Sequence, residues 1–374
     1  MKTFTLPQQE IRQCVENLNR VINPKSPIPV LDNLHCQLHE DGNLIMTAKG
    51  EGVYMTGRLT TDCLGENATF GIDHKIMGNI LKELSEQPLT FSIDGMKCVV
   101  NYHNGHFDVP FQDMTDYPTI PTMDNTKSFT IESNVLKNAI AGAGSFTIVD
   151  ELRPVMNAIC VDLLSDKAQA CLVGSDGHTL AKITVPCTVK QNERLLIPTE
   201  TAKIIEKILV HAKDEVTIEY NDKMIHVECG IYNLYIRMLN GRYPNYNSIL
   251  PANMYPTYLD VDRNALMAAV RRVGVCSDMN MLLKFTVDGY NLTLAGEDYD
   301  FSTGASETIF VDGKNKAIVI GLKGTLVQRI LTACKSEQVR IYYDDPSRLV
   351  IYCPLNGAEP DTSQLYIQMP MMIG

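Results

Sequence analysis

The feature that most constrains this fold is an internal repeat that occurs three times in 374 residues. Three segments each read as an alternating strand followed by a helix: KTFTLPQQEIRQCVENLNRVI, KSFTIESNVLKNAIAGAGSFT and PTYLDVDRNALMAAVRRVGVC. Phe4, Phe129 and Tyr258 hold equivalent places in them, 125 and 129 residues apart. A chain built this way is expected to fold as three similar domains.

A second strand and helix recur within each repeat. The segments are TFGIDHKIMGNILKEL, LLIPTETAKIIEKIL and AIVIGLKGTLVQRIL, which end at Leu84, Leu209 and Leu331. Apolar and polar residues alternate between and after the helices, which predicts strands, and Asp-Gly pairs in 39–43 and 287–291 indicate hairpin turns. Each repeat is therefore predicted to be α+β, with two helices on antiparallel sheets.

The joins between repeats are rich in proline and resemble each other. They read YPTIPTMDNTK and YPNYNSILPANMYP, and proline clusters of this kind mark loops. We place the domains at 1–123, 124–251 and 252–374.

Composition indicates a cytoplasmic globular protein. Hydrophobic residues make up 45% of the chain and charged residues 21%, and no run of apolar residues approaches the ~20 needed to span a membrane. The first ten residues lack the apolar core of a secretory signal. The eleven cysteines show no paired spacing, which favours reduced thiols in the core over a disulfide framework.

The charge of the chain is unevenly distributed. The net charge is -11, which alone argues against nucleic-acid binding. The six predicted helices nevertheless carry +8 together, so the remainder carries -19; their ranges are 7–21, 74–85, 134–144, 199–212, 263–274 and 321–335. Lysine and arginine favour the last turn of helices, which accounts for part of this bias. The remaining excess of positive charge on the helices predicts one cationic surface that faces a polyanion.

Three local motifs, on the threefold repeat, resemble one family. They are SDGHTLA at 175–181, NGRYPNYNSILP at 240–251 and MPMMI at 369–373. With this spacing the whole chain resembles the bacterial DNA polymerase III beta subunit, the sliding clamp. The resemblance implies a homodimer in which two chains join head to tail. Together they form a closed ring of six domains, three from each chain. Such a ring encircles duplex DNA without regard to sequence, tethers the polymerase for processivity and has no catalytic site.

The resemblance also implies a hydrophobic cleft between the second and third domains. In the family this cleft takes short extended peptides of the DNA polymerase III alpha subunit, the clamp loader, and other polymerases and repair proteins. Transferred by motif, it consists of Met156, Ser175, Gly177, His178, Thr179, Leu180, Pro244, Ser248, Ile249, Ile367, Met369, Pro370, Met371 and Met372. Methionine suits a surface that adapts to several partners, and a few apolar anchors give weak, exchangeable binding.

The cleft departs from the family pattern at two cationic positions. Thr179 and Met372 each stand where the family has arginine, and Gly374 is added at the end. We therefore expect partner peptides to rely little on acidic residues, so that their affinity falls only weakly as salt is added. Peptide titrations over a range of salt concentrations check this, and a steep loss of affinity would count against it.

Two further sets of residues are predicted. The DNA-facing cations comprise Lys25 and Arg153, which the resemblance implies, and six cations of the predicted helices: Arg263, Arg271, Arg272, Lys323, Arg329 and Lys335. The predicted dimer interface pairs Phe107 and Val109 of the first domain with Val275 and Cys276 of the third. The family's aromatic pair after the DNA-contacting arginine is Pro154-Val155 here, which argues against stacking at that point.

Rival functions find less support in the residues. Asp176 and His178 suggest an acid–base pair, but no nucleophile motif accompanies them and no other repeat keeps the histidine. On a strand, His35 and His39 share one face while Cys36 points to the other, which spoils a metal cluster. No phosphate-binding loop, dinucleotide fingerprint or zinc-protease motif occurs, so no cofactor or metal is expected. The remaining alternative is a repeat-built scaffold that binds proteins and never encircles DNA.

Overall fold

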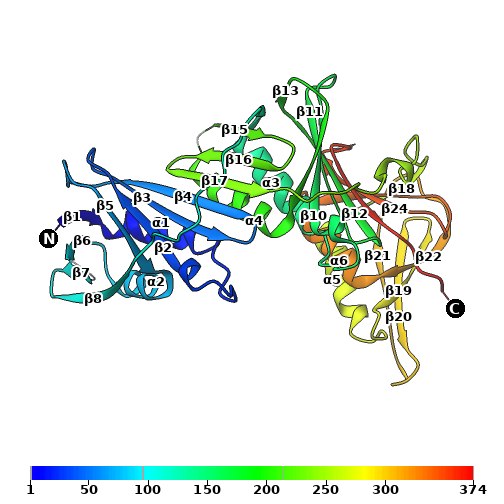
Figure 1. Ribbon diagram of the computed structural model, residues 1–374. Coiled ribbons are helices and arrows are strands. Elements are labelled where there is room, and N and C mark those ends of the chain that lie inside the picture. The colour runs from blue at the N-terminus through cyan, green and yellow to red at the C-terminus, as the bar shows by residue number, and fades with distance from the viewer. Residues whose placement is uncertain (1, 95–96, 213, 374) are drawn as a thin grey trace. The chain divides into compact units, whose positions relative to one another are not determined.

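The computed structural model describes residues 2–94, 97–212 and 214–373 (Figure 1). The same order of elements recurs three times along the chain, which confirms the predicted repeat. The strand pairs of the described residues are antiparallel, so the fold is α+β as predicted.

The helices match the predicted ones within a few residues. They are α1 (Gln8–Leu18), α2 (His74–Glu83), α3 (Ser133–Gly144), α4 (Thr199–Ile208), α5 (Arg263–Gly274) and α6 (Gly324–Ala333), with the short 3-10 turns η1 (Pro29–Asp32), η2 (Pro154–Asn157), η3 (Leu209–His211) and η4 (Tyr246–Ser248).

The strands follow the repeats. The first holds β1 (Lys2–Pro7), β2 (Asn33–Leu38), β3 (Asn43–Gly50), β4 (Val53–Thr60), β5 (Ala68–Asp73), β6 (Pro88–Asp94), β7 (Lys97–Tyr102) and β8 (Gly105–Gln112). The second holds β9 (Lys127–Glu132), β10 (Ala158–Leu164), β11 (Gln169–Ser175), β12 (Thr179–Pro186), β13 (Thr188–Val189), β14 (Glu193–Pro198), β15 (Glu215–Tyr220), β16 (Met224–Cys229) and β17 (Tyr232–Arg237). The third holds β18 (Thr257–Asp262), β19 (Leu282–Asp288), β20 (Asn291–Asp298), β21 (Thr303–Phe310), β22 (Ile318–Lys323), β23 (Gln338–Tyr343), β24 (Val350–Asn356), β25 (Glu359–Pro360) and β26 (Gln364–Gln368).

Helix α5 shows why these segments become helices. The side chain of Asp262 accepts a hydrogen bond from the backbone N–H of Ala265 at 2.7 Å, which satisfies one of the free donors of the first turn. Leu266, Val270 and Val273 repeat at helical spacing and are buried. Asp73 caps α2 in the same way, so an aspartate at the end of the preceding strand starts both helices.

The chain forms two compact units, whose boundary lies inside the second repeat. Unit 1 comprises Met1–Lys137, Cys187–Lys190 and Glu200–Asn240; unit 2 comprises Asn138–Pro186, Gln191–Thr199 and Gly241–Gly374. Unit 1 holds one continuous sheet, in which β4 of the first repeat pairs with β17 of the second. In unit 2, β12 of the second repeat pairs with β26 of the third. The three-domain division therefore stays a prediction about sequence repeats.

The cysteines belong to the core. All eleven are free thiols, and all but Cys276 are buried. Burial raises the pKa of Cys14 to about 12, which keeps this thiol protonated and unreactive. The prediction of core thiols is confirmed.

Candidate functional site

The turn between β11 and β12 is held by the carboxylate of Asp176. This carboxylate accepts hydrogen bonds from the backbone N–H groups of His178 at 2.9 Å and Thr179 at 2.7 Å, and from the Thr179 hydroxyl at 3.0 Å. Gly177 has a φ of 89°, a backbone conformation that favours glycine. Asp176 thus shapes the turn through its bonds to the His178 and Thr179 backbone.

Arg329 of α6 secures this turn from the third repeat. Its guanidinium donates to both the Asp176 carboxylate and the Thr179 hydroxyl. The same group lies 5.0 Å from the centre of the Phe146 ring, within cation–π range. Burial favours the neutral acid, but the hydrogen bonds from Arg329, Thr179 and His178 outweigh it and lower the pKa of Asp176.

Arg329 also affects how the substitution at position 179 is interpreted, because Thr179 stands where the family has arginine. A guanidinium is present beside Thr179 after all, because Arg329 reaches it from another repeat. Its charge is paired with Asp176, so the expectation of weak salt dependence remains.

The C-terminal segment lies along two strands of unit 2. Leu180 and Ile367 face each other in the β12–β26 register. Beyond β26, the Met369 N–H donates to the His178 carbonyl at 2.9 Å, and the Met371 N–H donates to the Gly321 carbonyl at 2.8 Å. The backbone of the tail is therefore fixed, while the side chains of Met369 and Met372 are 48% and 94% exposed. Gly374 lies outside the described residues.

The loop after β17 in the sequence is anchored by two buried tyrosines, Tyr243 and Tyr246. The Tyr246 hydroxyl donates to the Asp162 carboxylate at 2.6 Å, and Arg194 binds the same carboxylate at 2.8 Å. The predicted cleft residues of this loop, Pro244, Ser248 and Ile249, are exposed. The buried tyrosines thus hold the loop in place and leave its other side chains free for contact.

The fourteen predicted cleft residues all belong to unit 2. Backbone hydrogen bonds and strand pairing join the β11–β12 turn, β26 and the tail. Met156 is buried in η2, and Ile367 and Leu180 are buried in the sheet, whereas Met369 and Met372 are exposed. Sequence reasoning missed Asp162, Arg194, Tyr246 and the role of Asp176.

The predicted DNA-facing cations differ in their ion pairs and in their exposure. Three form ion pairs: Arg153 with Asp150, Arg272 with Glu307 and Arg329 with Asp176. Three are exposed: Lys25, Arg271 and Lys335. The other two, Arg263 and Lys323, are half-buried. Lys323 ends β22 and Lys335 follows the cap of α6. Helix α6 is therefore shorter than the 321–335 predicted, and both lysines flank it.

The predicted interface residues Phe107 and Val109 lie on β8, and Val275 and Cys276 directly follow α5. Phe107 stacks on Tyr102 at 5.2 Å, whereas Val109 is 1% exposed, so its side chain belongs to the core of unit 1. Val275 is 83% exposed directly after α5. Strand β21 is at the edge of its four-stranded sheet, and its residue Phe310 is 72% exposed. Sequence reasoning missed this edge.

Within residues 2–94, 97–212 and 214–373, no cluster of histidine, cysteine, aspartate or glutamate has the arrangement of a metal site. Over those same ranges, no helix is long and apolar enough to cross a membrane.

Comparison with known proteins gives consistent matches over the chain. The DNA polymerase III beta subunit N-terminal domain model matches residues 2–121, and the central domain model of the same subunit matches residues 130–245. A beta sliding clamp from Synechocystis sp. is 23% identical over 98% of both chains, and one from Chlamydia pneumoniae is 24% identical over 99% of both.

Solved structures agree with this. A sliding clamp from Pseudomonas aeruginosa bound to griselimycin has a TM-score of 0.92 at 18% identity, with both chains fully covered. The DNA polymerase III beta subunit from Thermotoga maritima has a TM-score of 0.91 at 18% identity, also with both chains fully covered.

Proposed function

Because the chain belongs to the DNA polymerase III beta subunit family, the bacterial sliding clamps, we propose that it forms a homodimeric ring around duplex DNA. The ring tethers the replicative polymerase and acts as a processivity factor in DNA replication, with no catalysis of its own. It works in the cytoplasm on DNA of any sequence. The observation that carries the proposal is the match of two successive domains of one family, in order, along the chain.

Sheet edges support dimer formation. In unit 1, residues 105–110 of β8 pair with β7, and β5 pairs with β8 only at Phe111 and Gln112. In unit 2, β21 pairs with β20 on one side. A strand edge presents free backbone donors and acceptors that suit another strand. Two edges on different units fit a head-to-tail dimer, the usual route to a closed ring. Val109 contributes its backbone to such pairing, since its side chain is buried.

The surface charge supports loose contact with DNA. Arg271 and Lys335 are exposed on or beside the helices of the third repeat, while Arg272 is neutralised by Glu307. A few free cations attract phosphates without sequence preference and without tight binding. Retention then comes from enclosure, which is compatible with the net charge of -11.

The unit 2 cleft supports partner recruitment. Its exposed methionines and isoleucine, Met369, Met372 and Ile249, offer apolar surface on a fixed backbone. We propose that it binds extended peptides of the polymerase III alpha subunit, the clamp loader, and other polymerases and repair proteins.

Retention on circular DNA tests ring closure. The protein is loaded onto nicked circular duplex with its clamp loader, isolated by gel filtration, and the DNA is then linearised. A ring stays on the circle and runs off the ends after the cut. A protein-binding scaffold shows no retention, and an ordinary DNA binder ignores the cut; either result rejects encirclement. Mass in solution is the independent check, and a monomer at micromolar concentration would contradict the ring.

A further inference from the structure

Unit 1 contains a second copy of the elements that build the cleft in unit 2. The turn η1 (Pro29–Asp32) corresponds to η2 (Pro154–Asn157) at an offset of 125 residues, so that Leu31 takes the place of Met156. The β3–β4 turn corresponds to the β11–β12 turn at the same offset. Each turn has glycine at a positive φ, 67° at Gly52 and 89° at Gly177.

The strand that borders the turn is also repeated. In unit 2, Ile367 of β26 faces Leu180, and Met369 then donates to the His178 carbonyl. In unit 1, Leu234 of β17 faces Met55, and the Arg237 N–H donates to the Gly52 carbonyl at 2.7 Å. Arg237, the last residue of β17, therefore lies beside the turn, and Met369, directly after β26, does so in unit 2.

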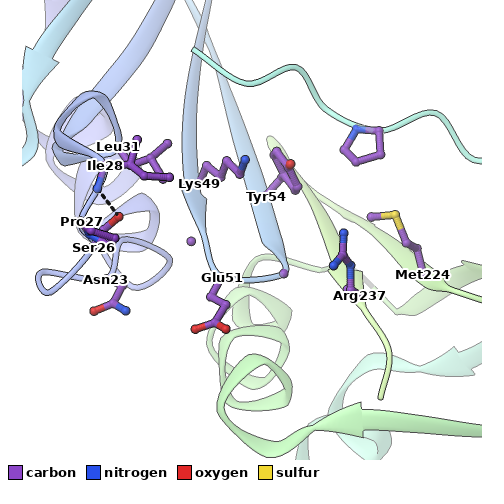
Figure 2. A pocket seen from close by; sticks show the side chains of 13 residues that line it. Asn23, Ser26, Pro27, Ile28, Leu31, Lys49, Glu51, Tyr54, Met224 and Arg237 are labelled. Atoms are coloured by element: carbon purple, nitrogen blue, oxygen red, sulfur yellow. Dashed lines mark hydrogen bonds between the residues drawn. The ribbon is translucent and has the colours of Figure 1, made fainter. Parts of the chain in front are cut away.

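These elements surround a groove in unit 1, which we call the unit 1 groove (Figure 2). Its volume is about 440 Å³, within the range of ligand-binding clefts. Figure 2 shows Ile28 and Leu31 on one side, the hairpin with Lys49 and Tyr54 in the middle, and Met224 and Arg237 on the other side. Ile28 is 48% exposed, so an apolar anchor has a surface to bury.

The groove differs from the unit 2 cleft in its charge. In unit 2, Asp176 and Arg329 neutralise each other. In the part of the chain that the structure describes, neither Lys49 nor Arg237 forms an ion pair with a carboxylate. Glu51 at the tip of the hairpin is exposed and offsets one of the two charges. The lining therefore keeps a net positive charge next to apolar side chains.

We propose that the unit 1 groove binds an extended peptide of a partner protein that carries an aliphatic anchor beside acidic residues. The anchor packs on Ile28, Leu31 and Met224, and the acidic residues pair with Lys49 and Arg237. The proposal rests on the proposed function, since it takes peptide capture as the role of the repeated elements in unit 2. Nucleic acid fits less well: Lys49 Nζ already lies over the Tyr54 ring, 5.0 Å from its centre, where a base would stack.

Methionine methyl spectra of the full-length protein test the groove and the cleft separately. Met224 lines the groove and Met156 belongs to the cleft. The probes are an acetylated hexapeptide with two leucines and two aspartates, its twin with two asparagines, and a hexathymidylate. We expect the aspartate peptide to shift Met224 and to bind there about fivefold more tightly than its twin at low salt, an advantage that shrinks as salt is added.

Charge variants provide the control. The double variant Lys49→Gln with Arg237→Gln removes the advantage of the aspartate peptide at Met224, while Arg58→Gln, an exposed cation on β4 outside the groove, leaves it unchanged. Three results would overturn the proposal: no shift of the Met224 signal, equal affinity of both peptides, or a shift caused only by the oligonucleotide. If the peptide does not bind the cleft proposed in unit 2, the methyl signal of Met156 does not shift, while that of Met224 still shifts.

Discussion

Replacing Arg329 by glutamine is expected to lower the free energy of unfolding by about 2–4 kcal/mol. The Arg329 and Asp176 side chains are only 26% and 12% exposed. The substitution leaves the Asp176 carboxylate partly buried without its cation, and it removes the contact with the Phe146 ring. Urea unfolding measures the loss, and hydrogen exchange at residues 175–180 shows whether the turn itself loosens.

Arg272→Gln is the matched control. Arg272 also binds a carboxylate, that of Glu307, but its side chain is 62% exposed. A surface pair of this kind contributes about 0–1 kcal/mol. Equal losses for the two variants would contradict the assignment of Arg329 as the residue that secures the turn.

Acid provides a second readout of the same pair. The folded-state pKa of Asp176 is lowered from its ordinary value of 3.8. A carboxyl whose pKa is lower in the folded state stabilises the fold above the unfolded-state pKa, and this stability is lost as pH falls through the folded pKa. The protein should therefore lose stability below about pH 4, and the Arg329→Gln variant should lose less over the same interval.

The double variant Met369→Ala with Met372→Ala is expected to weaken binding of a partner peptide about 10- to 100-fold, or about 1.4–2.8 kcal/mol in total. Full burial of one such side chain contributes about 1.5–3 kcal/mol, and each substitution removes only part of that contribution. The backbone hydrogen bonds of Met369 and Met371 to His178 and Gly321 do not depend on these side chains. The tail should stay in place, so retention on circular DNA should not change. Fluorescence anisotropy with a peptide from the polymerase III alpha subunit of the same genome measures the affinity.

Met279→Ala is the control for this variant. Met279 is fully exposed in unit 2 and belongs to no part of the predicted cleft. Its substitution should leave peptide affinity unchanged. A loss of the same size with Met279→Ala, or no loss with the tail variant, would show that the peptide binds elsewhere.

Several features of this protein followed from the sequence because they depend on neighbouring residues. The alternation of strands and the helical spacing of Leu266, Val270 and Val273 are local patterns, so the elements were predictable within a few residues. The aspartate at the start of α5 acts three residues away. The predicted ends of α6 were wrong by a few residues. Whether Lys323 and Lys335 are helical depends on backbone hydrogen bonds and not on side-chain spacing.

The candidate site was only partly predictable. Motif similarity identified residues on the β11–β12 turn, but it gave Asp176 no structural role. The partner of Asp176 is 153 positions away in the sequence, and no local pattern marks such a pair. Val109 shows the same limit, because an alternating strand does not tell which of its two faces a neighbouring element buries.

The amino-acid sequence by itself determined the threefold repeat, the α+β class and the family. Each can be recognised from sequence patterns that recur at short or constant spacing. Only the tertiary structure decided which charges are neutralised, which apolar side chains stay exposed, and that a groove lies beside Lys49 and Arg237 in unit 1. The physical reason is that ion pairing and burial depend on distances between elements, and packing sets those distances.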